Sequence, residues 1–145
     1  MPTIADDHEM KAIFFYGLFM DISLLREKGF SPSEPVMAYV DGFGLRIGER
    51  ATLVKSKNER AYGLVMTLSD EDVTSLYNET SVADYVPEKV HAFDTNNNAM
   101  EAIVYNLPKE LLSGRNISYA HSLAVVAKKA GLPTAYINEI EGWAS

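Results

Sequence analysis

Glu79 is the residue of this chain whose setting best suits acid–base chemistry. Its near neighbours in the sequence are apolar or aromatic: Leu76, Tyr77, Val82 and Tyr85. A carboxyl group buried among such side chains can accept a proton at neutral pH and act as a general base. Glutamates are mostly exposed, however, and periodicity does not show burial here, so the residues alone favour a surface glutamate at a helix end.

A second candidate feature is the passage from a strand into a loop at Tyr16-Gly17. The apolar run from Ala12 to Tyr16 stops at Gly17, which is the pattern of a strand that is buried on both faces and leads into a loop. Tyr16 is as good a candidate for the core as for a ligand contact, and Gly17 can serve through its backbone freedom alone. A loop of this kind and one general base are sufficient for an acid–base function.

Other catalytic chemistries find little support in the residue types. His8, His91 and His121 lie far apart and lack paired ligand spacing, so we expect no metal site. The chain has no cysteine, which excludes disulfides, thiolate nucleophiles and iron–sulfur ligation. The glycines from Gly42 to Gly48 miss the phosphate-binding spacing, and the sequence contains no Gly-x-Ser-x-Gly elbow.

Composition and charge narrow the class of protein further. The 145 residues are 47% hydrophobic, which is typical of a globular chain and fits one compact domain. The 13 basic and 20 acidic residues give a net charge of −7, and the basic ones are scattered, so we expect no nucleic-acid partner. No run is apolar enough to cross a bilayer and no signal peptide is evident, so we expect a cytoplasmic protein without a membrane partner.

The elements that position these residues follow from patterns along the chain. Residues 1–10 are polar and without periodicity, so we expect a flexible N-terminal arm, and residues 11–145 are expected to form a single domain. Asp21 can cap a short helix that Gly29 ends. The β-prone segments that follow are 36–39, 43–47, 51–55 and 62–67, with turns at Asp41-Gly42, at Gly48 and at 57–60.

Helices and one further strand pair complete the prediction. Ser69 can cap a helix over 70–78, and segments 86–93 and 99–105 are typical of paired strands. An apolar stripe that includes Tyr119 predicts a helix that ends at Gly131, and Thr134 can cap a last one. This order predicts one α+β domain, and the close succession of strands favours a curved sheet or small barrel.

Five runs of the sequence form a recognisable pattern when they are taken in order. They are Phe14-Phe15-Tyr16-Gly17-Leu18-Phe19-Met20, Ala51-Thr52-Leu53-Val54, Tyr62-Gly63-Leu64-Val65, Leu76-Tyr77-Asn78-Glu79 with Tyr85, and Tyr119 followed by residues 127–136. Together these runs resemble the gamma-glutamylcyclotransferase family, and the similarity covers almost everything after the N-terminal arm. Its most discriminating part is the helix break at Gly131-Leu132-Pro133 followed by Tyr136.

This resemblance implies a small mixed β-barrel with helices packed outside and a cavity at the Tyr-Gly loop. It also implies a reaction in which the α-amine of a γ-glutamyl amino acid or amine attacks its own γ-carbonyl and releases 5-oxoproline. No cofactor is required. Glu79 matches the catalytic glutamate, and the substrate-binding positions are Tyr16, Gly17, Leu18, Phe19, Tyr85 and Tyr119.

The sequence departs from the family pattern after the Tyr-Gly pair and after the glutamate. Leu18 stands where a polar residue is common, and Thr80 where a glycine often follows. Backbone N–H groups survive such changes. Glu88 and Glu71 are weaker rivals of Glu79 for the catalytic position.

The sequence alone leaves the function and the oligomeric state open. The alternative function is a non-catalytic module that binds a small molecule or a protein on the same barrel. A homodimer is also compatible with the sequence. Arg46 and Arg50 could reach a substrate carboxylate, but solvated strand residues are the commoner case, so neither is placed in the site.

Overall fold

Residues 10–80 and 82–144 are described by a computed structural model of the chain, so residues 1–9 of the predicted N-terminal arm lie outside the described part. Met10, the last residue of that arm, already begins the first strand. The described residues contain five strands: β1 (Met10–Phe15), β2 (Val36–Ile47), β3 (Ala51–Ser69), β4 (Val86–Asp94) and β5 (Ala99–Asn106).

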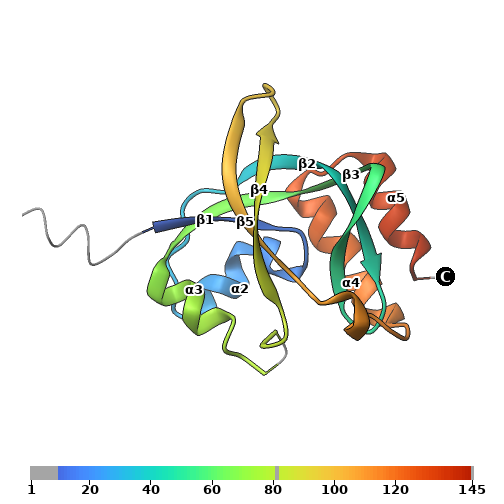
Figure 1. Cartoon of the computed structure of the whole chain (residues 1–145), viewed down its shortest axis with the longest axis horizontal. Coiled ribbons are helices and arrows are strands. Elements are labelled where there is room, and N and C mark those ends of the chain that lie inside the picture. The colour runs from blue at the N-terminus through green and yellow to red at the C-terminus, as the bar shows by residue number, and fades with distance from the viewer. Residues whose placement is uncertain (1–9, 81, 145) are drawn as a thin grey trace, which may run out of the picture.

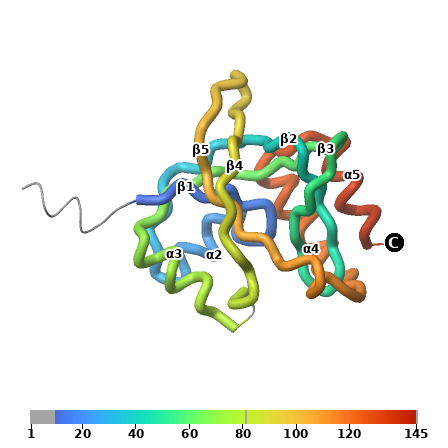
Figure 2. Tube along the Cα trace, viewed as in Figure 1, coloured from blue at the N-terminus to red at the C-terminus, as the bar shows by residue number. Residues whose placement is uncertain are grey.

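The sheet closes on itself in the order β1-β3-β2-β4-β5. Neighbouring strands are antiparallel except β1 and β5, which meet in parallel at Ile13 and Ile103. Figure 2 shows these two strands side by side although they lie far apart in the sequence. The predicted α+β class, with a mixed closed sheet and helices outside it, is confirmed.

Helices lie at two ends of the sheet (Figure 1). The short helices α2 and α3 lie below β1, whereas α4 and α5 lie beside the hairpin formed by β2 and β3. The described helices are the 3₁₀ helices η1 (Leu18–Met20) and η2 (Lys109–Leu111) and the α-helices α2 (Ile22–Glu27), α3 (Asp70–Leu76), α4 (Ile117–Ala130) and α5 (Thr134–Gly142).

Most helix ends are where the capping residues predict them. The side chains of Asp21 and Ser69 each accept a hydrogen bond from a backbone N–H in the first turn of their helices. Gly131 ends α4 with a left-handed backbone, at φ 80°. The prediction for α5 is wrong by one position, because Pro133 occupies the cap and Thr134 is the first helical residue.

The predicted turns at Asp41-Gly42 and at residues 57–60 are wrong as breaks between strands. Both lie inside the continuous strands β2 and β3, at a bulge where the register shifts between Asp41 and Phe43. Gly42 adopts φ 83° there, and residues 56–59 of β3 lie opposite it. The turn-forming residues therefore bend one long hairpin instead of ending its strands.

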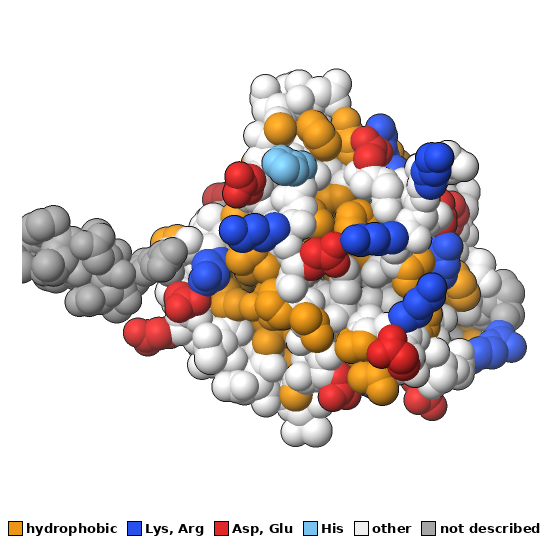
Figure 3. Space-filling model, viewed as in Figure 1, with side chains coloured by type: hydrophobic (Ala, Val, Ile, Leu, Met, Phe, Trp, Pro, Cys, Tyr) orange, Lys and Arg blue, Asp and Glu red, His pale blue; other side chains and the backbone are white. Residues whose placement is uncertain are grey.

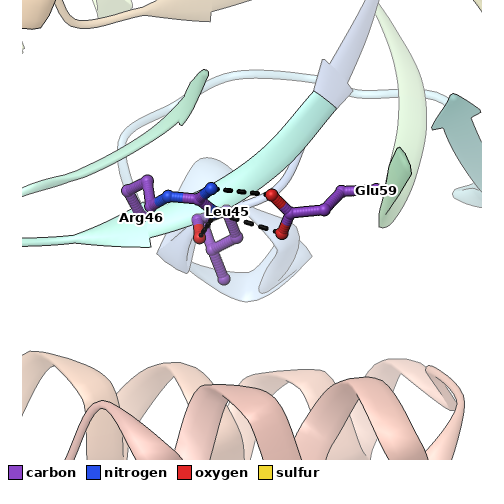
Figure 4. A network of polar contacts seen from close by, with 3 residues as sticks. All are labelled: Leu45, Arg46 and Glu59. Carbon is purple, nitrogen blue, oxygen red and sulfur yellow. Dashed lines mark hydrogen bonds and ion pairs between the residues drawn. The ribbon is translucent and has the colours of Figure 1, made fainter. Parts of the chain in front are cut away.

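The bulge directs Glu59 back onto β2. Arg46 donates from Nη1 and Nη2 to the two carboxylate oxygens of Glu59, at 3.1 and 2.7 Å (Figure 4). Gly44 makes this possible, since a Cβ at that position would lie 2.5 Å from the carboxyl carbon of Glu59. Glu59, a charged residue of the predicted turn, thus links β3 to β2 within the hairpin.

Apolar side chains fill the space between the sheet and the helices. Apart from tyrosines, Thr52 is the only buried polar side chain among the described residues, and its hydroxyl accepts a hydrogen bond from the Leu107 N–H at 2.9 Å. This bond ties the start of β3 to the segment that follows β5. No helix in the described part of the chain is long and apolar enough to span a membrane.

Candidate functional site

A cavity of about 390 Å³ lies beside the loop that follows β1. All six residues predicted to bind substrate line it: Tyr16, Gly17, Leu18, Phe19, Tyr85 and Tyr119. They come from the loop after β1, the segment before β4 and the first turn of α4. On the face of the molecule that carries α3 and β4, hydrophobic side chains gather among acidic and basic ones (Figure 3).

The loop after β1 is fixed at its first residue. Tyr16 is buried, and its hydroxyl donates a hydrogen bond to the backbone oxygen of Tyr105 at 2.7 Å. The helix η1 begins two residues later, at Leu18. Because the first N–H groups of a helix have no acceptor inside it, this loop presents backbone donors where its residues line the cavity.

Tyr119 is placed against this loop by the start of α4. The Asn116 side chain caps that helix by accepting a hydrogen bond from the Tyr119 N–H at 2.9 Å. The Tyr119 hydroxyl reaches Gly17 so closely that a Cβ on Gly17 would lie 2.8 Å from its oxygen. Burial raises the pKa of Tyr119, and a hydrogen bond from the Leu18 backbone opposes that shift. Close packing against Tyr119 is therefore a reason for glycine at position 17.

Tyrosines dominate the rest of the lining. Tyr77 stacks on Tyr105 with ring centroids 3.7 Å apart, and the Tyr85 hydroxyl donates to the backbone oxygen of Ala51. Burial raises the pKa of each of these tyrosines and of Tyr16, that of Tyr85 to about 12. At neutral pH these phenols are uncharged, so they can donate and accept hydrogen bonds but do not supply a general base.

Arg50 is the only charged residue among the described residues that line the cavity. Its Nη1 lies 3.0 Å from Oδ2 of Asp84, and the two side chains are 34% and 55% exposed. From the sequence, Arg50 was expected to be a solvated residue outside the site. The structure instead places a cation at the cavity, beside Tyr85, whose pKa it lowers against the larger effect of burial.

Glu79 lies next to the cavity without lining it. Its neighbours Tyr77 and Val82 belong to the lining, whereas its own Oε1 accepts a hydrogen bond from Lys28 Nζ at 2.8 Å. Its side chain is 34% exposed. The structure thus brings the six predicted binding residues together and leaves the predicted base just outside them, in an ion pair.

The two rival glutamates lie elsewhere. Glu71 is exposed in the first turn of α3. Glu88 lies on β4, 3.8 Å from Lys55, and lines a different hollow together with Val86 and Phe43. Neither residue contributes to the lining of the tyrosine-rich cavity.

Comparisons with known proteins place this architecture. No family model and no curated protein matches the sequence. A solved structure named gamma-glutamyl cyclotransferase superposes with a TM-score of 0.75 at 18% identity, over 92% of this chain and 87% of that one. The chain has the gamma-glutamyl cyclotransferase fold.

Two further structures of this fold are similar over most of their length. An uncharacterised protein from Homo sapiens gives a TM-score of 0.76 at 20% identity, over 92% of this chain and 87% of that one. An AIG2-like protein from Mus musculus gives 0.60 at 15% identity, over 72% of this chain and 84% of that one. The predicted resemblance to the cyclotransferase family is confirmed at the level of the fold.

Within this cyclotransferase fold, three lining residues of chemical interest were not predicted to belong to the site. Tyr105 ends a predicted strand as Tyr16 does, and this shared position could have identified it. Tyr77 was named only as a neighbour of Glu79, in the run that the two residues share. Arg50 was considered together with Arg46 as a possible contact for a substrate carboxylate, and both were expected to be solvated.

The described residues contain no group of three or more His, Cys, Asp or Glu side chains that could hold a metal ion. His91 and His121 are both exposed, and His8 lies outside the described residues. The chemistry available at the cavity is therefore that of neutral phenols, backbone N–H groups and one guanidinium, with the Glu79 carboxylate adjacent.

Proposed function

We propose that the chain is a gamma-glutamylcyclotransferase-like enzyme that converts a γ-glutamyl amino acid or amine to 5-oxoproline and the free amine. The observation that carries the proposal is the meeting of six predicted substrate-binding residues, from three distant segments, in one cavity. Chance would not gather them, since the lining draws on the loop after β1, the segment before β4 and the start of α4. The cyclotransferase fold gives the proposal its reaction.

The reaction places modest demands on the protein. The α-amine nitrogen attacks the γ-carbonyl carbon and forms the lactam bond, and the bond from that carbon to the departing nitrogen breaks. One proton leaves the attacking nitrogen and one is delivered to the departing nitrogen. Because nucleophile and electrophile belong to one molecule, the site must fold the substrate, move this proton and stabilise the oxyanion.

The residues of the cavity suit these tasks unequally. Backbone donors of the loop from Gly17 to Phe19 would hold the glutamyl end and the developing oxyanion, and the Leu18 backbone would exchange its hydrogen bond with Tyr119 for one with the substrate. The neutral tyrosines would orient the substrate. Glu79 would take the proton, and for this it must exchange its contact with Lys28 for one with the substrate amine. An ion pair this exposed contributes at most about 1 kcal/mol of free energy, so breaking the contact with Lys28 requires little energy.

The Lys28 contact also favours a second candidate function. A carboxylate held outside the cavity by a lysine leaves a tyrosine-lined pocket without a base. Such a pocket can bind a small acid without turning it over. The second candidate is therefore a binding module on the same fold, and the experiment below separates it from the enzyme.

The test measures 5-oxoproline release by liquid chromatography with mass detection, from γ-glutamyl amino acids, γ-glutamyl amines and glutathione. Glu79→Gln should lower turnover by about 100- to 10,000-fold, because it removes the base and keeps the shape. It should retain the thermal stabilisation that substrate gives the wild type. Glu59→Gln is the matched control: that carboxylate is paired with Arg46, outside the cavity, and turnover should persist.

Three results would contradict parts of the proposal. Release that Glu79→Gln leaves unchanged would remove Glu79 from the mechanism. If the folded wild type releases no 5-oxoproline from any compound of the panel but is thermally stabilised by these compounds, the binding module is established instead. If it shows neither release nor stabilisation, both candidates are excluded.

A further inference from the structure

Arg50 gives the cavity a second recognition point, distinct from the loop after β1. Resting on the proposed function, we propose that Arg50 determines the substrate class by binding the carboxylate of the departing amino acid, whose apolar or aromatic side chain lies against the aromatic wall. The substrates would be γ-glutamyl conjugates of apolar and aromatic amino acids, not of simple amines.

Donors lie at two separate places around the cavity. One is the loop from Gly17 to Phe19, where the Leu18 backbone already gives a hydrogen bond to the Tyr119 hydroxyl. The other is at the β2–β3 hairpin, where Arg50 precedes Ala51 and the Tyr85 hydroxyl is bonded to the Ala51 backbone. A γ-glutamyl amino acid carries two carboxylates, one on each side of the reacting amide. Two separate donor sets match that arrangement, whereas a γ-glutamyl amine would use one of them.

Most hydrogen-bond donors of the Arg50 guanidinium are unused. Its one hydrogen bond to the described residues runs from Nη1 to Oδ2 of Asp84, at 3.0 Å. A guanidinium has five N–H donors in a planar fork that fits a carboxylate through two parallel bonds. Asp84 therefore holds Arg50 at the cavity from one side and leaves most of the fork for a ligand. Since Asp84 is 55% exposed, this pair costs little to share.

The wall of the cavity is mostly aromatic. Apart from Arg50, the described lining consists of aromatic and small apolar residues, among them Phe14, Phe15 and Phe19. Phe19 meets Tyr77 edge to face, with ring centroids 6.4 Å apart, and Tyr77 in turn stacks on Tyr105. Aromatic rings in such arrangements attract another ring or an aliphatic chain. A volume of about 390 Å³ is within the range that small-molecule sites use.

The decisive experiment compares two substrates that differ by one carboxylate. These are γ-glutamylphenylalanine and γ-glutamylphenethylamine, each assayed for 5-oxoproline release with wild type and Arg50→Met. The wild type should prefer the acid, and Arg50→Met should lower kcat/KM for the acid by about 10- to 100-fold, mostly through KM, because a charge-assisted hydrogen bond is lost. The kcat/KM for the amine should change by less than about threefold, because Arg50 makes no such hydrogen bond with that substrate.

Two further variants sharpen the result. Arg50→Lys keeps the charge and loses the planar fork, so it should recover only part of the preference for the acid. Arg46→Met is the matched control, because Arg46 lies in the same hairpin with similar exposure and does not line the cavity. It should leave the ratio of acid to amine unchanged.

Each outcome decides the inference. An equal loss on both substrates, or an unchanged preference in Arg50→Met, overturns it while the proposed function stands. If the wild type turns over neither substrate, the wider panel of γ-glutamyl compounds decides the proposed function, and calorimetric binding of these two compounds decides the inference. Tighter binding of the acid that Arg50→Met abolishes then supports carboxylate recognition by Arg50, and equal or absent binding overturns it.

Discussion

Two arginines of one hairpin differ in how far their donors are already used. Arg46 gives two N–H groups to Glu59 and a third contact to the Leu45 backbone oxygen at 3.0 Å (Figure 4). Arg50, four residues later, makes one contact with Asp84. Their side chains are almost equally exposed, at 32% and 34%. Exposure therefore does not distinguish an arginine that stabilises the fold from one that can bind a ligand. The number of guanidinium N–H groups that are still unused does distinguish them.

The surroundings of the two arginines differ in the same sense. The Arg46–Glu59 pair lies over Gly44, in a hollow that Tyr136 and Glu139 of α5 also line, and its hydrogen bonds lower the pKa of Glu59 to about 2. Arg50 lies at a cavity whose other described residues are uncharged. A charge that is fully paired stabilises the hairpin, whereas a charge beside neutral phenols is available to a ligand. Substitutions that affect the surroundings of one arginine at a time can therefore separate the two roles.

The largest effects should come from the two glycines that let a neighbour approach. Gly17→Ala would drive a Cβ to 2.8 Å from the Tyr119 hydroxyl and displace it from the loop. A shift of this size at a substrate-positioning loop should lower kcat/KM by about 10- to 100-fold. Gly44→Ala would push Glu59 away from Arg46, which should cost about 1 kcal/mol of stability, or about 3 °C in Tm, and leave turnover intact.

Steady-state assays at 25 °C and thermal unfolding of both variants measure this contrast. Full activity in Gly17→Ala would mean that the loop does not position the substrate. A loss of activity in Gly44→Ala at full stability would mean that the polar pair acts on the cavity, against the comparison drawn above.

A smaller effect is expected from Lys28, which holds Glu79 as Asp84 holds Arg50. Lys28→Met removes the 2.8 Å contact and should raise kcat by up to about fivefold, the equivalent of the roughly 1 kcal/mol that an exposed ion pair contributes. Lys55→Met is the control, since Lys55 lies 3.8 Å from Glu88 and outside the cavity. A fall of kcat in Lys28→Met alone would show that Lys28 assists Glu79 instead of restraining it.

Much of the fold could be predicted because its elements begin and end on residues with local effects. Asp21, Ser69 and Gly131 act within a turn of the chain, so their influence is visible in the sequence. The hairpin of β2 and β3 was predicted in pieces, because Gly42 and the charged residues 57–60 suit a turn as well as a bulge. Only the pairing of the two strands across that bulge decides between them.

The candidate site could be predicted in part for a similar reason. Tyr16 to Phe19 and Tyr119 were found through the order of runs along the chain, and the cavity brings them together. Arg50 was missed because its role depends on what Asp84 and the cavity wall leave free, which is a property of the assembled fold. The position of Glu79 depends likewise on Lys28, a residue from another segment.

The smallest expected effect concerns the pH dependence of the fully paired charge. The hydrogen bonds from Arg46 lower the pKa of Glu59 from 4.5 to about 2 in the folded chain. A carboxyl whose folded pKa is depressed stabilises the fold above its unfolded pKa and loses that contribution as pH falls. At pH 7 the free energy of unfolding of the wild type should thus exceed that of Glu59→Gln, by no more than the roughly 1 kcal/mol of a partly exposed pair.

This difference should shrink as the pH falls below about 4.5 and disappear below about 2, where both chains carry an uncharged side chain at position 59. Thermal unfolding of the two proteins at several pH values measures it directly. Because Arg50 is not fully paired, Asp84→Asn should lower the stability at pH 7 by less than Glu59→Gln does. A larger difference for Asp84→Asn would place the structural ion pair at the cavity and would reverse the roles assigned to the two arginines.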